Sequence, residues 1–110
     1  MKSINVNNFP EIIEPAIALG RRIATARKRR KIRQADMATK TGLSRSTIQA
    51  IERGDLTCST GALLNVLWTM GLIKELDLLA DPGLDRDGLT LALNVESKRV
   101  GVSRKVDNDF

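Results

Sequence analysis

Residues 33–54, RQADMATKTGLSRSTIQAIERG, restrict the possible folds of this chain more than any other segment. Gly42 and Gly54 each follow a short stretch of helical character. Glycine takes the left-handed conformation that commonly ends a helix without steric cost. Ser44, just after the first glycine, can cap the next helix by accepting a hydrogen bond from a free amide. The segment therefore predicts two short helices joined by a tight turn.

The second of these helices is expected to present a polar face. Ile48 and Ile51 form an apolar edge at a spacing of three residues, which leaves Arg45, Ser46 and Gln49 off that edge. A polar helix face held by a compact partner helix is the arrangement that enters the major groove of DNA. The pattern therefore indicates a DNA-binding regulator.

The distribution of charge supports this interpretation. Residues 1–54 carry 12 Lys or Arg against 4 Asp or Glu, a net charge of +8, whereas residues 55–97 carry 2 against 7, a net charge of −5. The last 13 residues have a net charge of +2. A basic half joined to an acidic half is expected when one face of a protein meets a polyanion. The alternative is that the charges only keep the protein in solution, and charge alone does not decide between the two.

The composition argues against several other classes of protein. The chain has no His and one Cys, Cys58, so a zinc site and an internal disulfide are excluded, and a reducing compartment is expected. Without a Gly-rich phosphate loop or clustered carboxylates, we expect neither an enzyme nor a cofactor. No apolar run approaches the ~20 residues that span a bilayer, and the N-terminus lacks the apolar stretch of a signal peptide. We therefore expect a cytoplasmic protein with no membrane partner.

The length of 110 residues allows one domain with an extension. We expect a loose leader over residues 1–15, where two prolines discourage a long helix, and a helical domain over residues 16–81. An aromatic content of 3% favours helices packed on helices over a β-sandwich. Besides the two short helices, the domain is expected to contain helices over residues 16–32, 60–70 and 73–80.

Residues 82–110 have a different pattern and are expected to form a C-terminal extension for dimer or partner contact. Leu89, Leu91 and Leu93 alternate with Thr, Ala and Asn, which is the period of a β-strand. An isolated strand pair is marginal in water. The extension is therefore expected to pair with a second copy, to pack on a partner, or to remain mobile.

Residues 21–72 resemble the Cro/C1-type helix-turn-helix family, also called the Xre family of bacterial and phage repressors. The matching segments are IATARKRRKIRQADMATKTGLSRSTIQAIERGD and STGALLNVLWTMGL, about half of the chain, and they include Gln34, Gly42 and the Glu-Arg-Gly ending. The resemblance implies an all-α, five-helix bundle in which the second and third helices form the DNA-reading unit. We expect this bundle to be followed by a short extended or β C-terminal tail.

The resemblance also implies which residues contact DNA. Arg45 suits a bidentate contact to guanine O6 and N7, because its planar fork fits two acceptors. The other residues implied to read bases are Ser44, Ser46 and Gln49, of which the last two could instead bond to a phosphate. The residues implied to hold the DNA backbone lie mainly at helix ends: Arg33, Gln34, Lys40, Thr47 and Arg53.

Three of these expectations have simpler alternatives. Thr47 could pack beneath its helix, and Arg45 could be an ordinary surface arginine. The basic run over residues 27–31 could be a solvated helix face that adds only non-specific affinity. Glu52 is expected to be structural, pairing with an arginine of the first helix.

Together these features predict a sequence-specific, autoregulatory transcriptional repressor. It would bind a palindromic double-stranded DNA operator as a homodimer, with half-sites about one helical turn (~10 bp) apart. The compact domain with an extended tail also resembles HipB-like antitoxins, which implies a type II toxin–antitoxin pair with a HipA-like kinase toxin as partner. The alternatives are a stand-alone or phage repressor, and a protein-interaction module that uses the same fold without reading DNA.

Overall fold

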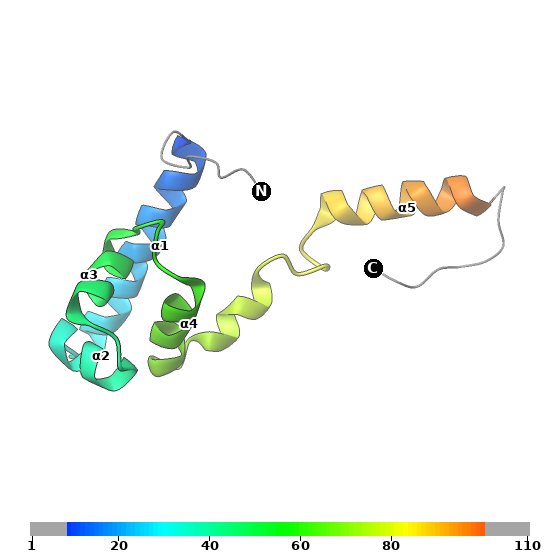
Figure 1. The fold of residues 1–110 in the computed structure, drawn as a ribbon. Helices are drawn as coiled ribbons and strands as arrows, with labels where there is room; N and C mark the ends of the chain where they lie inside the picture. Colours follow the sequence, from blue (N-terminus) through cyan, green and yellow to red (C-terminus); the bar gives the residue numbers. More distant parts are fainter. Residues whose placement is uncertain (1–8, 101–110) are drawn as a thin grey trace. The chain divides into compact units, whose positions relative to one another are not determined.

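The computed structural model describes residues 9–100, apart from the side chains of residues 97, 99 and 100. Within this range every regular element is a helix, which confirms the predicted all-α helix-turn-helix bundle. The elements in Figure 1 are α1 (Pro10–Arg29), α2 (Gln34–Thr41), α3 (Arg45–Arg53), α4 (Thr60–Thr69), the 3-10 helix η2 (Ile73–Leu78) and α5 (Arg86–Val100). None of the described helices is long and apolar enough to cross a membrane.

The chain divides into two compact units, with the boundary between Ile73 and Lys74. The first unit therefore contains α1 to α4, and η2 begins at its last residue. The sequence predicts a domain that continues to residue 81, with a fifth α-helix over residues 73–80. The structure has the shorter 3-10 helix η2 in that place.

The first helix begins earlier than predicted. Pro10 lies in the first turn of α1, where a residue needs no amide partner and the fixed φ of proline suits a helix. Pro15 lies inside the helix and removes one hydrogen bond from it. The prediction of a loose leader is therefore wrong for residues 10–15. Its remaining part, over residues 1–8, lies outside the described residues.

The core of the first unit forms where the four helices meet. α1 packs on α3, α3 on α2, and α2 on α4, as the compact group of helices in Figure 1 shows. The most deeply buried side chains, Met37, Ile48 and Val66, are 1–2% exposed and come from three different helices. The other buried apolar residues are Ile23, Ile51, Ala62 and Met70. This core holds α3 by its apolar edge.

Two glycines bring α1 into direct contact with the end of α3. A Cβ atom on Gly20 would lie 2.6 Å from the carbonyl oxygen of Glu52, and one on Gly54 would lie 2.5 Å from the carbonyl oxygen of Ala16. Gly54 also has a φ of 77°, in the left-handed region. Any larger residue at either position would push α1 and α3 apart. The contact therefore fixes the end of α3 on α1.

The predicted extended or β tail over residues 82–110 is wrong for residues 86–100, which form the helix α5. Asp85 immediately precedes this helix, and its Oδ1 accepts a hydrogen bond of 3.0 Å from the amide of Gly88. Such a cap is a strong helix-start signal. The alternating leucines were misleading because a helix with apolar residues on two opposite sides produces the same short pattern. Residues 101–110 lie outside the described residues.

Candidate nucleic-acid interface

The turn between α2 and α3 has the predicted geometry. Gly42 has a φ of 76° and its amide donates to the carbonyl oxygen of Ala38 at 2.9 Å. Ser44 caps α3, because its Oγ accepts a 3.1 Å hydrogen bond from the amide of Thr47. The turn is also fixed by the amide of Leu43, which donates to Thr41 Oγ1 at 3.2 Å. The two short helices are therefore joined rigidly by local hydrogen bonds.

The two sides of α3 have opposite chemistry. Ile48 and Ile51 are 1% and 4% exposed and lie in the core. The predicted base-reading residues Arg45, Ser46 and Gln49 are all exposed. The helix thus presents a polar surface while its apolar edge is held by the bundle.

The exposed residues of α3 form a row. Arg45, Gln49 and Arg53 follow one another at intervals of four residues, so they lie along one side of the helix. Ser46 directly follows Arg45 in the first turn of α3 and is exposed as well. The structure therefore brings Arg53, predicted to hold the backbone, into line with the predicted base readers.

A buried ion pair joins α1 to α3. Arg27 Nε donates to Glu52 Oε2 at 2.6 Å, and Arg27 Nη2 donates to Glu52 Oε1 at 3.0 Å. Both side chains are 9% exposed. The hydrogen bonds to Glu52 raise the pKa of Arg27 above its usual value. This pair confirms the predicted structural role of Glu52 and removes Arg27 from the solvated basic run.

The same carboxylate also holds the start of α2. Gln34 Nε2 donates to Glu52 Oε1 at 3.0 Å, and Arg27 Nη1 donates to the carbonyl oxygen of Ile32 just before α2. Glu52 therefore links α1, α2 and α3 through one side chain. Sequence reasoning placed Gln34 near DNA but did not anticipate this contact.

The remaining predicted backbone contacts differ in how free their side chains are. Arg33 lies before α2 and its Nε donates to Asp36 Oδ2 at 3.1 Å. The hydrogen bonds from Arg33 hold the pKa of Asp36 below its usual range. Lys40 is exposed near the end of α2, whereas Thr47 is half-buried with its Oγ1 2.9 Å from Ser44 Oγ.

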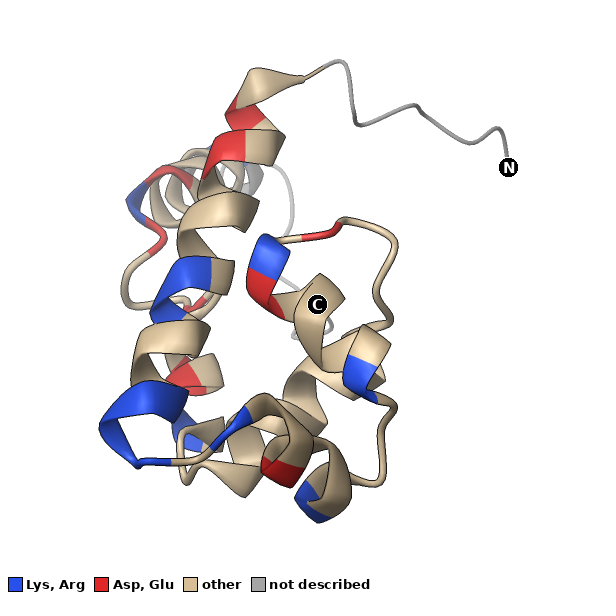
Figure 2. Ribbon diagram, turned by 90° about the vertical axis from the view of Figure 1, so that its left-hand side faces the viewer, with Lys and Arg blue, Asp and Glu red and all other residues tan. Residues whose placement is uncertain are grey.

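Basic side chains gather around one end of the bundle. Figure 2 shows acidic segments at the start of α1 and basic segments where α1 ends and around α2 and α3. Glu11 lies in the first turn of α1, whereas its last turn carries Arg27, Lys28 and Arg29. Except for Arg27, the residues of the basic run over positions 27–31 are exposed. Their charge is therefore available to a polyanion near α2 and α3.

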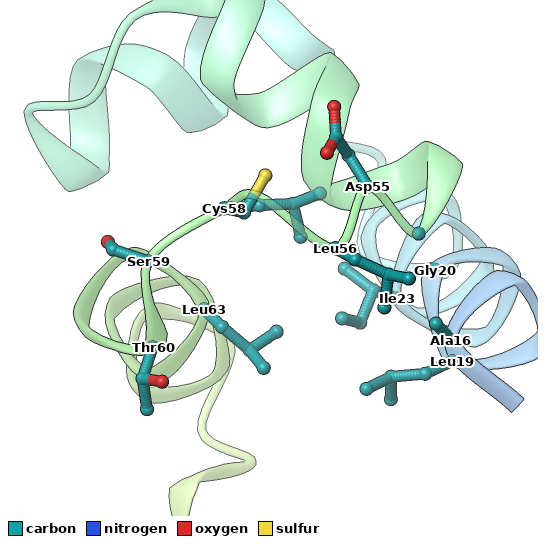
Figure 3. A pocket seen from close by; sticks show the side chains of 12 residues that line it. Ala16, Leu19, Gly20, Ile23, Asp55, Leu56, Cys58, Ser59, Thr60 and Leu63 are labelled. Atoms are coloured by element: carbon teal, nitrogen blue, oxygen red, sulfur yellow. The ribbon is translucent and has the colours of Figure 1, made fainter. Parts of the chain in front are cut away.

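A small pocket lies away from this row, between α1 and the start of α4 (Figure 3). Its volume is about 210 Å³, and Leu19 and Leu63 approach it from opposite sides. Small-molecule sites are usually larger, roughly 300–1,000 Å³. Burial raises the pKa of the Cys58 thiol in its lining, so the thiol stays protonated near neutral pH. The pocket therefore offers neither the size of a ligand site nor an activated nucleophile.

Comparison with models of known protein families gave a match over most of the first unit. A family model described as a helix-turn-helix domain matches residues 18–75, which is more than half of the 110 residues. The match includes all of α2, α3 and α4 and every predicted DNA-contacting residue. Searches of curated proteins and of solved structures gave no significant match.

Proposed function

This chain belongs to the helix-turn-helix domain family, and we propose that it is a sequence-specific transcriptional repressor that binds its own operator through α3. Membership of this family supports a role as a DNA-binding regulator. The proposal of sequence-specific binding rests on one observation. Arg45, Gln49 and Arg53 form an exposed row on a helix whose other edge is buried. A rigid helix with such a row can enter a major groove without first having to fold.

Within this row we assign base reading chiefly to Arg45. Its guanidinium is exposed and lies in the first turn of α3, where recognition helices contact base edges. Ser46 and Gln49 can donate to or accept from a base edge or a phosphate. Ser44 is less suited to base reading than the sequence implied, because its oxygen already caps α3. We assign Ser44 to supporting the helix.

The residues around the row are proposed to bind phosphates. Lys40 and Arg53 are exposed near helix ends, and Thr47 lies beside the cap of α3. Arg33 is available only in competition with Asp36, whose carboxylate would lie close to any phosphate that Arg33 binds. Gln34 is held in place by Glu52 and can use its second amide proton. Phosphate contacts position the protein but carry little sequence information.

The proposed operator is palindromic and the proposed active form is a homodimer. A palindrome reflects the two-fold symmetry of a dimer, with half-sites about one helical turn (~10 bp) apart. Binding is expected to weaken steeply with salt, because basic side chains displace counterions from phosphates.

The test is a titration of DNA from upstream of the protein's own gene, with scrambled DNA as competitor. Arg45→Ala is expected to weaken specific binding by ~1–3 kcal/mol while leaving affinity for scrambled DNA nearly unchanged. The matched control is Lys40→Ala, which should weaken binding to both DNAs and lower the salt slope by about one. If scrambled DNA displaces the protein and Arg45→Ala has no effect, the protein-interaction module is the better account.

A narrower form of the proposal makes this chain the antitoxin of a pair with a HipA-like kinase toxin. Its first support, an extended tail, is lost because residues 86–100 form α5. Its remaining support is an acidic second unit with exposed apolar side chains such as Leu78 and Leu79, which suit a protein partner. Co-purification with a kinase encoded by the adjacent gene would support it. An isolated gene or a phage location would favour a stand-alone or phage repressor.

A further inference from the structure

Helix α5 carries its large apolar side chains into solvent. Leu89, Leu91, Leu93 and Val95 are 52–66% exposed, although they lie in a helix of 15 residues. A helix of this length is marginal on its own in water and is usually stabilised by packing its apolar side. α5 therefore needs a surface that covers it.

One side of α5 has a pattern that specifies this surface. Arg86, Leu89, Leu93 and Glu96 follow at intervals of three, four and three residues, so they form one line along the helix. All four side chains are exposed. We call these four residues the α5 seam. It has two leucines at its centre, a positive charge at one end and a negative charge at the other.

We propose that the α5 seam is covered by the α5 seam of a second copy of this chain, with the two helices antiparallel. With the two-fold axis level with Leu91, Leu89 packs on Leu93 of the partner subunit. Arg86 then faces Glu96 of the partner subunit, and symmetry repeats both contacts. Each leucine of the α5 seam is then covered by a leucine, and each charge of the seam faces its opposite.

The ends of the seam distinguish this arrangement from a parallel one. In a parallel pair of helices in register, Arg86 would face the partner's Arg86 and Glu96 would face the partner's Glu96. Like charges placed opposite each other oppose association, and opposite charges favour it. The seam is thus complementary to itself in the antiparallel orientation. This charge pattern is what selects a second copy over an unrelated partner.

The inference concerns the second unit and does not require that α3 read DNA. It deepens the proposed function, because an antiparallel pair of α5 helices has the two-fold symmetry that a palindromic operator requires. Leu91 lies on the opposite side of α5 from the seam and takes no part in the pair.

The test is the mass of the full chain in solution, measured by sedimentation over a range of concentrations. The wild type is expected to dimerise. Leu89→Asp should raise the dissociation constant about 100-fold or more, since each variant chain loses an apolar contact and symmetry doubles the loss. Arg86→Glu should raise it about tenfold by placing two acidic side chains together at each end.

Charge exchange makes the test specific to the register. Glu96→Arg alone should weaken the dimer as Arg86→Glu does, and the double variant with both changes should restore wild-type association. Arg86→Glu also places an acidic residue in the first turn of α5, which a helix favours, so its effect cannot come from loss of the helix. The matched control is Lys98→Glu, the same change of charge on the other side of α5, which should leave the mass unchanged.

Three outcomes would overturn the inference. They are a monomer at every concentration, a dimer that Leu89→Asp does not weaken, and single charge changes that the double variant does not rescue. Arg45→Ala serves to separate this inference from the proposed function, because it should weaken specific DNA binding by ~1–3 kcal/mol without changing the mass. A dimer that binds no specific DNA would therefore refute the proposed function alone.

Discussion

The two units of this chain differ in what they do with apolar side chains. In the first unit, Met37 and Ile48 are 1% exposed and lie among four helices. In the second, Leu79 and Leu91 are 69% and 66% exposed. The first unit buries enough apolar surface to stabilise itself, whereas the second forms helices with little core of its own. The first unit thus has a core of its own, and the exposed side chains of the second agree with our proposal that a second copy covers α5.

The polar residues show the same contrast. Arg27 and Glu52 form a buried ion pair that joins helices of the first unit. The charged residues of α5 that the structure describes are exposed. Among the described residues of the first unit, no buried side-chain polar atom lacks a hydrogen-bond partner. Replacing single side chains should therefore change the stability of the first unit. In the second unit such changes should have little effect unless its partner is bound.

The largest effect is expected at the buried ion pair. Glu52→Ala leaves the Arg27 guanidinium buried without its carboxylate and removes the partner of Gln34, so it should destabilise the first unit by about 3–5 kcal/mol. Urea unfolding followed by circular dichroism measures this change. The control is Glu75→Ala, an exposed acidic residue of η2, which should change the free energy of unfolding by less than about 0.5 kcal/mol.

A double variant makes this prediction sharper. Replacing both members of a buried pair with apolar residues of similar volume is often neutral, because no charge is then left unpaired. Arg27→Met combined with Glu52→Leu should therefore recover most of the stability that Glu52→Ala loses. If the single and the double variant lost the same amount of stability, the hydrogen bonds of Arg27 and Glu52 would stabilise the unit through more than charge pairing.

A somewhat smaller effect is expected in the apolar core. Ile48→Ala should cost about 2–5 kcal/mol, since the side chain is fully buried and leaves a cavity. Leu91→Ala removes an equally large side chain from α5 but should change stability by less than about 0.5 kcal/mol. Thermal unfolding at low protein concentration compares the two. If Leu91→Ala lowered the stability as much as Ile48→Ala, the two units would not differ in how they use apolar side chains.

The smallest of these three losses of stability is expected at Gly20, where the backbone of α1 touches the end of α3. Gly20→Ala should destabilise by about 1–3 kcal/mol, because its Cβ would lie 2.6 Å from the Glu52 carbonyl oxygen. Gly61→Ala is the control, since no atom lies within 4 Å of the added Cβ and alanine favours a helix. That control should be neutral or slightly stabilising in the same unfolding measurement. If both variants unfold alike, the glycine contact does not fix α3.

The helix pair of the candidate site was predictable because its signals are local. Gly42, Ser44 and Gly54 lie next to the helix ends that they define, and all three behave as expected. The exposure of Arg45, Ser46 and Gln49 followed from the spacing of the isoleucines. The contact that each of these residues makes with DNA stays a prediction, because it depends on how DNA binds to the exposed side of α3.

The tail was not predictable from its short pattern. Leu89, Leu91 and Leu93 fit one face of a β-strand, and they fit equally a helix that has apolar residues on two opposite sides. The decisive signal was the cap at Asp85, whose hydrogen bond to Gly88 spans three residues.

The sequence by itself determined where the helices of the recognition unit begin and end, and which edge of α3 is apolar, because these depend on neighbours within four residues. Only the tertiary structure decided that Arg27 is buried, that Gln34 and Arg27 share Glu52, and that Gly20 touches the end of α3. These contacts join residues 18 to 34 positions apart. Such partners are chosen by how the helices pack, and no local pattern specifies them.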